Sequence, residues 1–350
     1  MTQPVSGGSL AAQAAGDAAP VVLVLRALGL GDGLAGVAAL RGLRRMSPGS
    51  WLVLAAPAGI GGFLLRRGVV DEVLDTVEMD ALTPEPWASR RGVGAGQPPD
   101  VAVDLHGCGP ASHRVLQALH PRRLVAWRCP AAGFSDGPEH RLDEQEVQRW
   151  CRLVTAAGGP CSPADLLLDP GGPDAGGPGP RALPPPPVTG PFAVLHPGAA
   201  SGSRRWPAER FAEVGAALAA DGWPVVVTGG AGERELTRAV TPAGGTDLAG
   251  ELDLDTLASV VAHAGLVVCG DTGVAHLATA YRTPSVLLFG PTPPAWWGPA
   301  VDPELHRVLW HGPDLAGGEL YRGDPHGTDV DPALALVTPA EVLTAVRGLA

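Results

Sequence analysis

Short apolar runs alternate with amphipathic segments along the whole chain. In the first half, buried strands are predicted at 21–25, 51–55, within 69–77, at 101–105 and at 124–127. Helices are predicted between them at 34–46, 58–67, 111–119 and 144–157. Alternating strands and helices are typical of α/β folds with parallel sheets.

The second half repeats this alternation after a break in composition. Strands are predicted at 192–195, 225–228, 266–269 and 285–289, and helices at 207–220, 233–240, 254–264, 274–280 and 338–348. The last helix has a capping box, with Thr338 as N-cap and Glu341 three residues later. The break, residues 170–190, is rich in Pro and Gly and predicts a semi-rigid linker.

These patterns predict two Rossmann-like domains facing each other across a cleft. The first spans 21–169 and the second 191–350, and residues 1–20 are predicted to be a disordered leader. A cleft of this kind suits a bound nucleotide and a second substrate.

The charged residues narrow the choice of function. The net charge of −11 and a pI of about 5.3 argue against a nucleic-acid binder, whose surface would be basic. All 25 basic residues are Arg, so P-loop, pyridoxal and kinase chemistry lack the Lys they need. Any bound phosphate must be held by Arg, backbone N–H groups or hydroxyls.

The cysteines and the apolar runs indicate a compartment. The five Cys are scattered with no zinc-binding spacing, which favours thiols in a reducing cytoplasm and predicts no metal site. Residues 1–20 lack the basic and apolar parts of a signal peptide, and no apolar run is long enough to span a membrane.

A glycine loop, Gly31-Asp-Gly-Leu-Ala-Gly36, follows the first predicted strand. It matches the dinucleotide fingerprint, so an NAD(P)-dependent oxidoreductase is one hypothesis. However, residues 55–58 read AAPA where that fingerprint needs a ribose-binding acid. Asp32 is then either a helix N-cap or, more specifically, a carboxylate held at the cleft mouth as a general base.

Two loops of the second half are candidates for holding a nucleotide. Arg204 and Arg205 follow Ser201 in a Gly/Ser loop that suits a diphosphate, although Trp206 would also anchor a plain helix start there. The other loop follows strand 225–228 and includes Thr228, Gly229, Gly230 and Glu233. Its glutamate would bind ribose hydroxyls or cap the next helix.

The turn after strand 266–269 is the third candidate. Asp271, Thr272 and Gly273 stand at the carboxyl end of a strand and the amino end of a helix, where N–H groups attract anions. His276 lies in that helix and is either a ligand or a packed histidine. His106 and His263 carry weaker signals, and His263 is interpreted as structural.

Taken together, these motifs resemble glycosyltransferase family 9, the ADP-heptose:lipopolysaccharide heptosyltransferases and their relatives. The matching pieces run in family order from 21 to 294: the GDG loop, the DLHG of 104–107, HPGAASGSRRWP of 196–207, VVVTGG of 225–230, and GDTGVAHLATA with PSVLLFGPTPP between 270 and 294. The resemblance implies a GT-B fold and inverting, metal-independent transfer without a cofactor.

The resemblance also implies roles for single residues. Asp32 becomes the base, with Gly31, Gly33 and His106 on the acceptor side. Arg204 takes the place of a phosphate-binding Lys. Asp271, Thr272, Gly273 and His276 fall on the nucleotide-sugar motif. The sequence departs from the family at Ala200, where a Ser is usual, and at Arg204.

The resemblance implies a nucleotide-diphospho-sugar donor, with ADP-heptose as the first candidate. The acceptor is a glycan, a lipid-linked molecule or a natural product, and peripheral membrane association stays open. A nucleotide-sugar-binding protein without catalysis is a second alternative. Residues 311–335, rich in Gly, Asp and His, form either a lid or a surface excursion.

Overall fold

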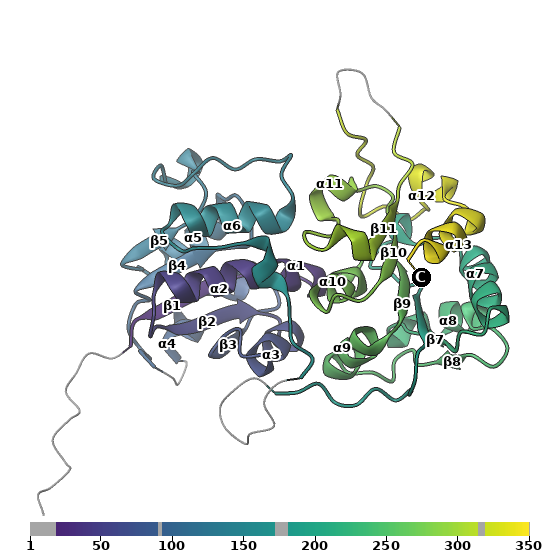
Figure 1. Ribbon diagram of the computed structural model, residues 1–350. Coiled ribbons are helices and arrows are strands. Elements are labelled where there is room, and N and C mark those ends of the chain that lie inside the picture. Colours follow the sequence, from purple (N-terminus) through teal and green to yellow (C-terminus); the bar gives the residue numbers. More distant parts are fainter. Residues whose placement is uncertain (1–18, 90–92, 172–180, 314–318, 350) are drawn as a thin grey trace, which may run out of the picture.

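Two lobes, each built on a parallel sheet, make up the protein (Figure 1). The structure is a computed structural model that describes residues 19–89, 93–171, 181–313 and 319–349. The predicted leader and linker therefore lie largely or partly outside the described residues.

The N-terminal lobe contains a sheet with the strand order β3-β2-β1-β4-β5. Its strands are β1 (Val21–Leu25), β2 (Trp51–Ala56), β3 (Glu72–Asp75), β4 (Val101–Asp104) and β5 (Arg123–Val125). Its helices are α1 (Leu30–Ala35), α2 (Val37–Met46), α3 (Ala58–Arg66), α4 (Pro84–Ser89), α5 (Ala111–Gln117) and α6 (Glu146–Ala156).

The C-terminal lobe contains a sheet with the order β11-β10-β9-β6-β7-β8. Its strands are β6 (Ala193–His196), β7 (Val225–Val227), β8 (Thr246–Asp247), β9 (Leu266–Gly270), β10 (Ser285–Leu288) and β11 (His306–Leu309). Its helices are α7 (Ala208–Ala220), α8 (Arg234–Val240), α9 (Leu254–His263), α10 (Gly273–Ala280), α11 (Pro294–Trp297), α12 (Pro332–Leu336) and α13 (Pro339–Arg347).

Helices cover both faces of each sheet, which explains why the strands read as nearly unbroken apolar runs. Every residue of β1 and of β9 is buried. In the N-terminal lobe α2, α3 and α6 pack on one face and α4 and α5 on the other. In the C-terminal lobe α9 and α10 pack on one face and α7, α8 and α13 on the other.

Each sheet reverses its strand order at one point, and these points fix where a ligand can bind. The reversal lies between β1 and β4 in the first sheet and between β9 and β6 in the second. The loops that leave two adjacent strands there diverge to opposite faces and leave a crevice at the carboxyl edge. The GDG segment, the Ser201 loop and the Asp271 turn all follow such strands.

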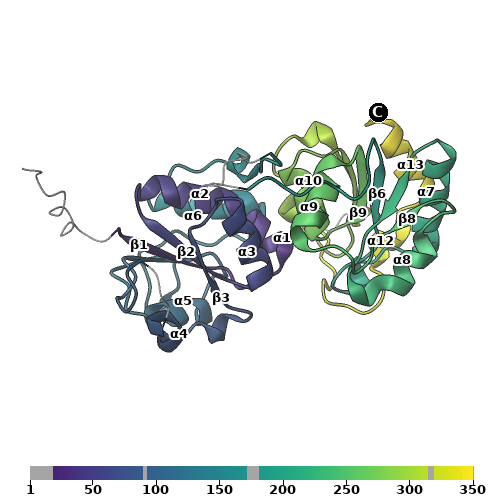
Figure 2. The ribbon, with the colours of Figure 1, turned by 90° about the horizontal axis from the view of Figure 1, so that it is seen from below.

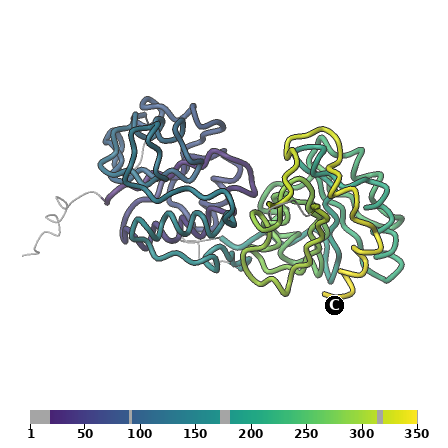
Figure 3. Tube along the Cα trace, turned by 90° about the horizontal axis from the view of Figure 1, so that it is seen from above, coloured from purple at the N-terminus to yellow at the C-terminus, as the bar shows by residue number. Residues whose placement is uncertain are grey.

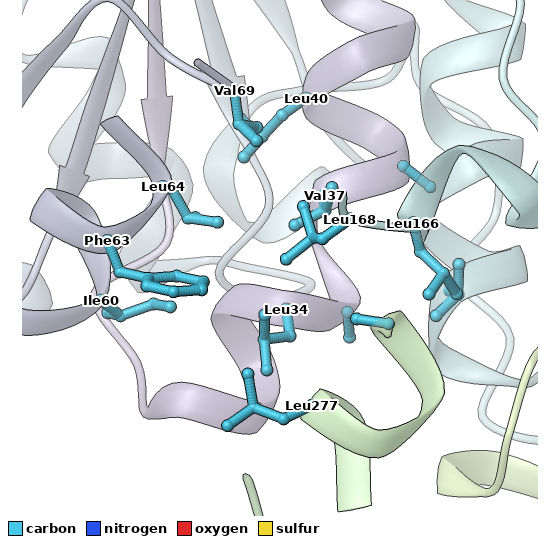
Figure 4. Close-up of a cluster of buried hydrophobic side chains, with 14 of the residues drawn as sticks. Leu34, Val37, Leu40, Ile60, Phe63, Leu64, Val69, Leu166, Leu168 and Leu277 are labelled. Atoms are coloured by element: carbon cyan, nitrogen blue, oxygen red, sulfur yellow. The ribbon is translucent and has the colours of Figure 1, made fainter. Parts of the chain in front are cut away.

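The lobes meet along an apolar seam formed by α1 and α10 (Figure 2). Leu34 of α1 and Leu277 of α10 belong to one buried cluster that crosses the seam (Figure 4). The Arg66 and Arg67 guanidinium groups pair across it with the Asp255 carboxylate of α9. Seen from above, the two lobes lie side by side and the chain crosses near the seam (Figure 3).

The first predicted helix was wrong in its extent. Residues 30–46 form two helices, because the Gly36 N–H closes α1 on the Asp32 and Gly33 carbonyls and α2 begins directly after it. Asp32 therefore lies inside the first turn of α1, whose N-cap is Gly29, and not in a flexible loop. The interpretation of Asp32 as an N-cap is wrong for the same reason.

Several short elements were missed. They are α4, α11, α12, β8 and β11. All three of these helices begin with Pro, and the pattern of apolar residues alone does not reveal such a start. The capping box of the last helix is confirmed, since the Glu341 N–H donates to Thr338 Oγ1 and Glu341 accepts from the Thr338 N–H.

The expectation of unpaired thiols needs a correction. Cys151 of α6 and Cys161 form a disulfide, with their Cα atoms 5.1 Å apart. A helix and a following turn bring together two residues that the linear spacing did not single out. Cys108, Cys129 and Cys269 are free thiols.

Candidate functional site

A cavity of about 530 Å³ opens where the two lobes face each other. Its N-terminal wall is the start of α1, from Gly29 to Asp32. Its C-terminal wall is formed by Ala200, Arg204, Asp271, Thr272, Gly273, His276, Pro291, Thr292, Trp296, Trp297, Arg322, Gly323, Pro325 and His326. The cavity therefore joins the carboxyl edges of both sheets at their reversal points.

Asp32 faces this cavity from the first turn of α1. Its side chain is about a third exposed, and one carboxylate oxygen lies 3.6 Å from the Arg26 Nη2. Burial is the main cause that raises the pKa of Asp32, and the Glu146 charge adds to it, whereas Arg26 and His106 oppose it. A raised pKa makes this carboxylate a stronger base than a free one.

Arg204 stands on the opposite wall and is positioned by its own loop. Its Nε donates to Ser201 Oγ at 3.2 Å, and its Nη1 donates to the Asp271 carbonyl at 3.4 Å. Ser201 is itself held, because its hydroxyl donates to the Pro325 carbonyl at 2.6 Å. Ser201 thus supports Arg204 and does not line the cavity.

The turn after β9 brings a carboxyl group and a helix N-terminus to the same wall. Thr272 is the N-cap of α10, and its side chain does not cap the helix, so the Gly273 and Val274 N–H groups have no cap from it. Burial raises the pKa of Asp271 to about 6, with Arg204 opposing and Asp32 reinforcing the shift. Asp32 and Asp271 therefore act on each other across the seam.

His276 is a neutral group in this setting. Burial lowers its pKa to about 4, so the imidazole carries no charge at neutral pH. Its ring packs edge-on against Trp297 with centroids 6.0 Å apart, and it lies over Gly31 of the other lobe. It can give or accept a hydrogen bond in the cavity without repelling or attracting charge.

The remaining predicted residues lie beside the cavity and not in its lining. Thr228 is buried and its hydroxyl bonds with His196 Nδ1 at 3.0 Å. Glu233 accepts from the Gly230 N–H at 2.8 Å, which is the capping alternative, and lies 3.8 Å from Arg205. Gly229 packs against Thr237.

On the N-terminal side, Gly33 packs against Ile60 in the seam and does not face the cavity. His106 follows β4, and burial is the main cause that lowers its pKa. His263 Nδ1 donates to the Ser259 carbonyl at 2.8 Å within its own helix, as its structural interpretation predicts.

Comparison with known proteins identifies the chain. Residues 139–314, just over half of the sequence, match glycosyltransferase family 9 (heptosyltransferase).

This chain belongs to glycosyltransferase family 9.

The relatives support this assignment to different extents. Lipopolysaccharide heptosyltransferase 2 of Escherichia coli K12 is 34% identical over 117 residues, which are 31% of this chain and 34% of that protein. Lipopolysaccharide heptosyltransferase 1 of Salmonella typhimurium is 26% identical over 297 residues, 79% of this chain and 90% of its own. The first curated relatives are matched over only about a third to a half of their length.

Solved structures show the same fold. A family 9 glycosyltransferase from Veillonella parvula aligns over 94% of this chain and 97% of its own with a TM-score of 0.71 at 17% identity. The Escherichia coli ADP-heptose lipopolysaccharide heptosyltransferase II aligns over 94% and 98% with a TM-score of 0.68 at 23% identity. The family 9 chain therefore has the GT-B fold that its sequence predicted.

The structure adds wall residues that sequence reasoning missed. Within residues 311–335, the described part from 319 onward packs onto two loops. The Ser203 N–H of the Ser201 loop donates to the Gly327 carbonyl, and the Gly323 N–H donates to the carbonyl of Pro291, which follows β10. This brings Arg322 and His326 to the cavity, and the Arg322 guanidinium lies 5.5 Å from the Trp296 ring. The segment is a wall of the site and not a simple surface excursion.

Two features of the family 9 chain concern metals and membranes. Within the described ranges, no group of three or more His, Cys, Asp or Glu side chains is placed to hold a metal ion. Among the helices of the described residues, none combines the length and apolar character needed to cross a membrane.

Proposed function

We propose that this family 9 protein transfers a sugar from a nucleotide-diphospho-sugar to an acceptor hydroxyl, with ADP-heptose as the first donor to test. The observation that carries the proposal is the shared cavity. It places Asp32 of one lobe opposite Arg204 and the start of α10 of the other. A base and a diphosphate site on facing walls are the two groups that such a transfer needs.

The diphosphate would bind at the start of α10. The Gly273 and Val274 N–H groups and the positive end of the helix favour an anion there. Arg204 adds a guanidinium, which binds phosphate oxygens bidentately. The names and structures of the relatives, which include an Escherichia coli heptosyltransferase with ADP, support ADP as the nucleotide.

In the proposed reaction Asp32 takes the proton from the acceptor hydroxyl. The acceptor oxygen attacks the anomeric carbon from the side opposite the diphosphate, and the bond between that carbon and the phosphate oxygen breaks with its electrons moving to the diphosphate. One displacement inverts the anomeric centre. A positioned base of this kind contributes about 10²–10⁴-fold.

We propose that the transfer is metal-independent because the protein itself supplies the positive charge. As the leaving bond breaks, negative charge develops on the diphosphate beside Arg204 and the α10 N–H groups, which are already in place. His276 is uncharged at neutral pH and would orient a sugar hydroxyl or a phosphate oxygen by a hydrogen bond.

The structure gives less support to the two alternatives, an NAD(P)-dependent oxidoreductase and a binding protein without catalysis. The glycines of the GDG segment are used in packing: Gly31 lies under His276, Gly33 against Ile60 and Gly36 against Arg26. They do not form an open loop around a pyrophosphate, so the oxidoreductase hypothesis has no support here. A nucleotide-sugar-binding protein without catalysis would have the same cavity. It would differ from the proposed enzyme only because Asp32 would not act as a base.

The acceptor is proposed to enter from the N-terminal lobe, beside Asp32. A glycan, a lipid-linked molecule or a natural product all carry the required hydroxyl. We also propose that the reaction takes place in the cytoplasm, where nucleotide-sugars are made, with peripheral membrane contact if the acceptor is lipid-linked.

The first experiment is a thermal-shift panel with ADP, UDP, GDP, ADP-heptose and NADH on the full chain. Stabilisation by ADP and ADP-heptose supports the proposal. Stabilisation by NADH alone would overturn it.

The second experiment tests Asp32 directly. Asp32→Asn is expected to lower release of ADP from ADP-heptose, with acceptor or with water, by at least about 100-fold while ADP still binds. Asp221→Asn, an exposed residue at the end of α7, serves as a matched control with native activity. An Asp32→Asn enzyme that retains the native rate would refute Asp32 as the base.

A further inference from the structure

A buried charge cluster lies directly behind Asp32. Arg26 follows β1 and is only 2% exposed. Its Nε donates to the Asp32 carbonyl and its Nη1 to the Leu105 carbonyl, so it ties α1 to the end of β4. Its guanidinium also lies over the Trp150 ring, 5.0 Å from the centroid. Arg26 cannot move without moving the turn that carries Asp32.

Two carboxylates compete for this guanidinium, and they hold it differently. The Arg26 Nη2 donates to Glu146 Oε1 at 3.2 Å, which is a hydrogen bond. The same nitrogen is 3.6 Å from Asp32 Oδ1, close enough for attraction but too long for a hydrogen bond. Glu146 therefore forms the hydrogen bond with Arg26, and the Asp32 carboxylate stays directed toward the cavity.

Glu146 is fixed by more than Arg26. It is the first residue of α6 and is 4% exposed. Its Oε1 accepts from the Trp150 Nε1 at 2.6 Å, and its Oε2 accepts from the Arg149 Nη1. Arg149 is in turn held by the Arg141, Leu142 and Glu144 carbonyls. A carboxylate that accepts from three side-chain donors is held in one position.

The geometry points to Glu146 as a positioning residue for Asp32: by binding the Arg26 guanidinium, it keeps the Asp32 carboxylate turned to the cavity and free to accept a proton. This role rests on the proposed function of Asp32 as a base. If Glu146 lost its charge, Arg26 would be a buried cation with one remaining carboxylate partner. It would then bind Asp32 fully, drawing it away from the cavity and making it a weaker base.

The other charged or titratable groups near Asp32 do not hold the Arg26 guanidinium away from it. Arg26, Glu146 and His106 act on it from its own lobe, and Asp271 faces it from the C-terminal lobe. Burial lowers the pKa of His106, which keeps it neutral near pH 7. Of these groups, Glu146 is the one hydrogen-bonded to Arg26 by its side chain.

The test is a carboxyl-carbon NMR titration of the full chain labelled with ¹³C-aspartate, with Asp32 assigned by its absence in Asp32→Asn. In Glu146→Gln we expect the Asp32 titration to move to lower pH by roughly one unit, because the Arg26 charge is no longer shared. Release of ADP from ADP-heptose should fall about three- to tenfold at pH 8, with little change in KM.

Glu144→Gln is the matched control. It removes a carboxylate two residues away that pairs with Arg152 and has no contact with Arg26 among the described residues. Asp32 should titrate there as in the native chain. An unchanged Asp32 titration in Glu146→Gln, or an equal shift in both variants, would overturn the inference.

If Glu146→Gln does not fold, Glu146→Asp provides the same test. The shorter side chain keeps the charge but withdraws it from Arg26, so the Asp32 titration should move in the same direction by a smaller step. No shift in that variant would equally overturn the role of Glu146. The titration needs no substrate, so its failure is distinct from failure of the proposed function, which would appear as native protein that neither binds ADP nor turns over ADP-heptose.

Discussion

Asp271 is a residue of this site whose burial as a charged carboxylate lowers the stability of the fold. It is buried in the cavity wall, and burial raises its pKa to about 6. The folded protein then binds a proton between about pH 4 and 6 that the unfolded chain has released. The free energy of unfolding therefore falls as the pH rises through that window, and this loss of stability is complete above it. Such a cost is expected where a charge is needed for function.

We predict that Asp271→Asn stabilises the fold at pH 7.5 and has little effect at pH 4. The rise in the pKa of Asp271 from 3.8 to about 6 corresponds to roughly 2–3 kcal/mol at most, which would raise the melting temperature by several degrees. Thermal unfolding at both pH values measures this. An equal change in melting temperature at pH 4 and pH 7.5 would contradict it.

Short elements with small residues set the closeness of the two lobes. α1 and α10 cross with Gly31 against His276 and Gly273 against Leu30. A Cβ added at Gly31 would lie 2.8 Å from His276 Cδ2, which is too close for carbon atoms. The two glycines thus allow the helix starts to approach and bring the two cavity walls together.

Gly31→Ala is therefore expected to destabilise the protein by about 1–3 kcal/mol and to lower ADP-heptose turnover by misplacing Asp32. Gly59→Ala on α3 is the matched control, since the added methyl group meets open space there. That change should be neutral or stabilising by roughly 0.5–1 kcal/mol. Chemical unfolding measures both, and a Gly31→Ala protein as stable as Gly59→Ala would contradict the role of this crossing.

The segment from 319 to 331 acts at the same scale. Arg322 is exposed on the cavity wall and stacks on Trp296, and it forms no ion pair with another described residue. We predict that it binds an anionic group of the substrate. Arg322→Ala should weaken ADP binding or raise the acceptor KM about five- to tenfold, less than a fully buried charged contact would. Arg238→Ala, an exposed Arg on α8, should change neither in calorimetry or kinetics.

At the scale of the whole molecule, the seam decides whether the two half-sites make one site. The cluster that contains Leu34 and Leu277 crosses it, the Leu168 N–H donates to the Ala280 carbonyl, and Asp255 binds Arg66 and Arg67. An apolar seam with ion pairs beside it favours the closed arrangement over separate lobes. The rate of transfer should depend on that arrangement.

Asp255→Asn should loosen the seam without touching the cavity. We expect a larger radius of gyration in small-angle scattering and a decrease of about two- to fivefold in kcat/KM, with ADP restoring part of the compact form. Asp302→Asn, which breaks an Arg282 pair within the C-terminal lobe, is the matched control. A native scattering curve for Asp255→Asn would contradict this prediction.

The sequence by itself determined the fold class and most of the strands. Apolar runs of the length of β1 and β9 can be buried only in a sheet covered on both faces, and the turns after them can lie only at the carboxyl edge. The motifs also placed Asp32, Arg204 and Asp271 among the candidates, because turn residues after such strands are the usual ligand groups.

Only the tertiary structure decided which candidates share one cavity. Asp32 and Arg204 are far apart in the chain and meet because α1 and α10 pack across the seam. Glu146 and Arg322 gave no local signal, since a charge at a helix start or in a polar loop is ordinary until its neighbours are known. Ser201 proved to bind Arg204 and the 319–331 segment, and Glu233 proved to hold its own loop. Local patterns fix local structure, whereas contacts between distant segments depend on the packing of the whole chain.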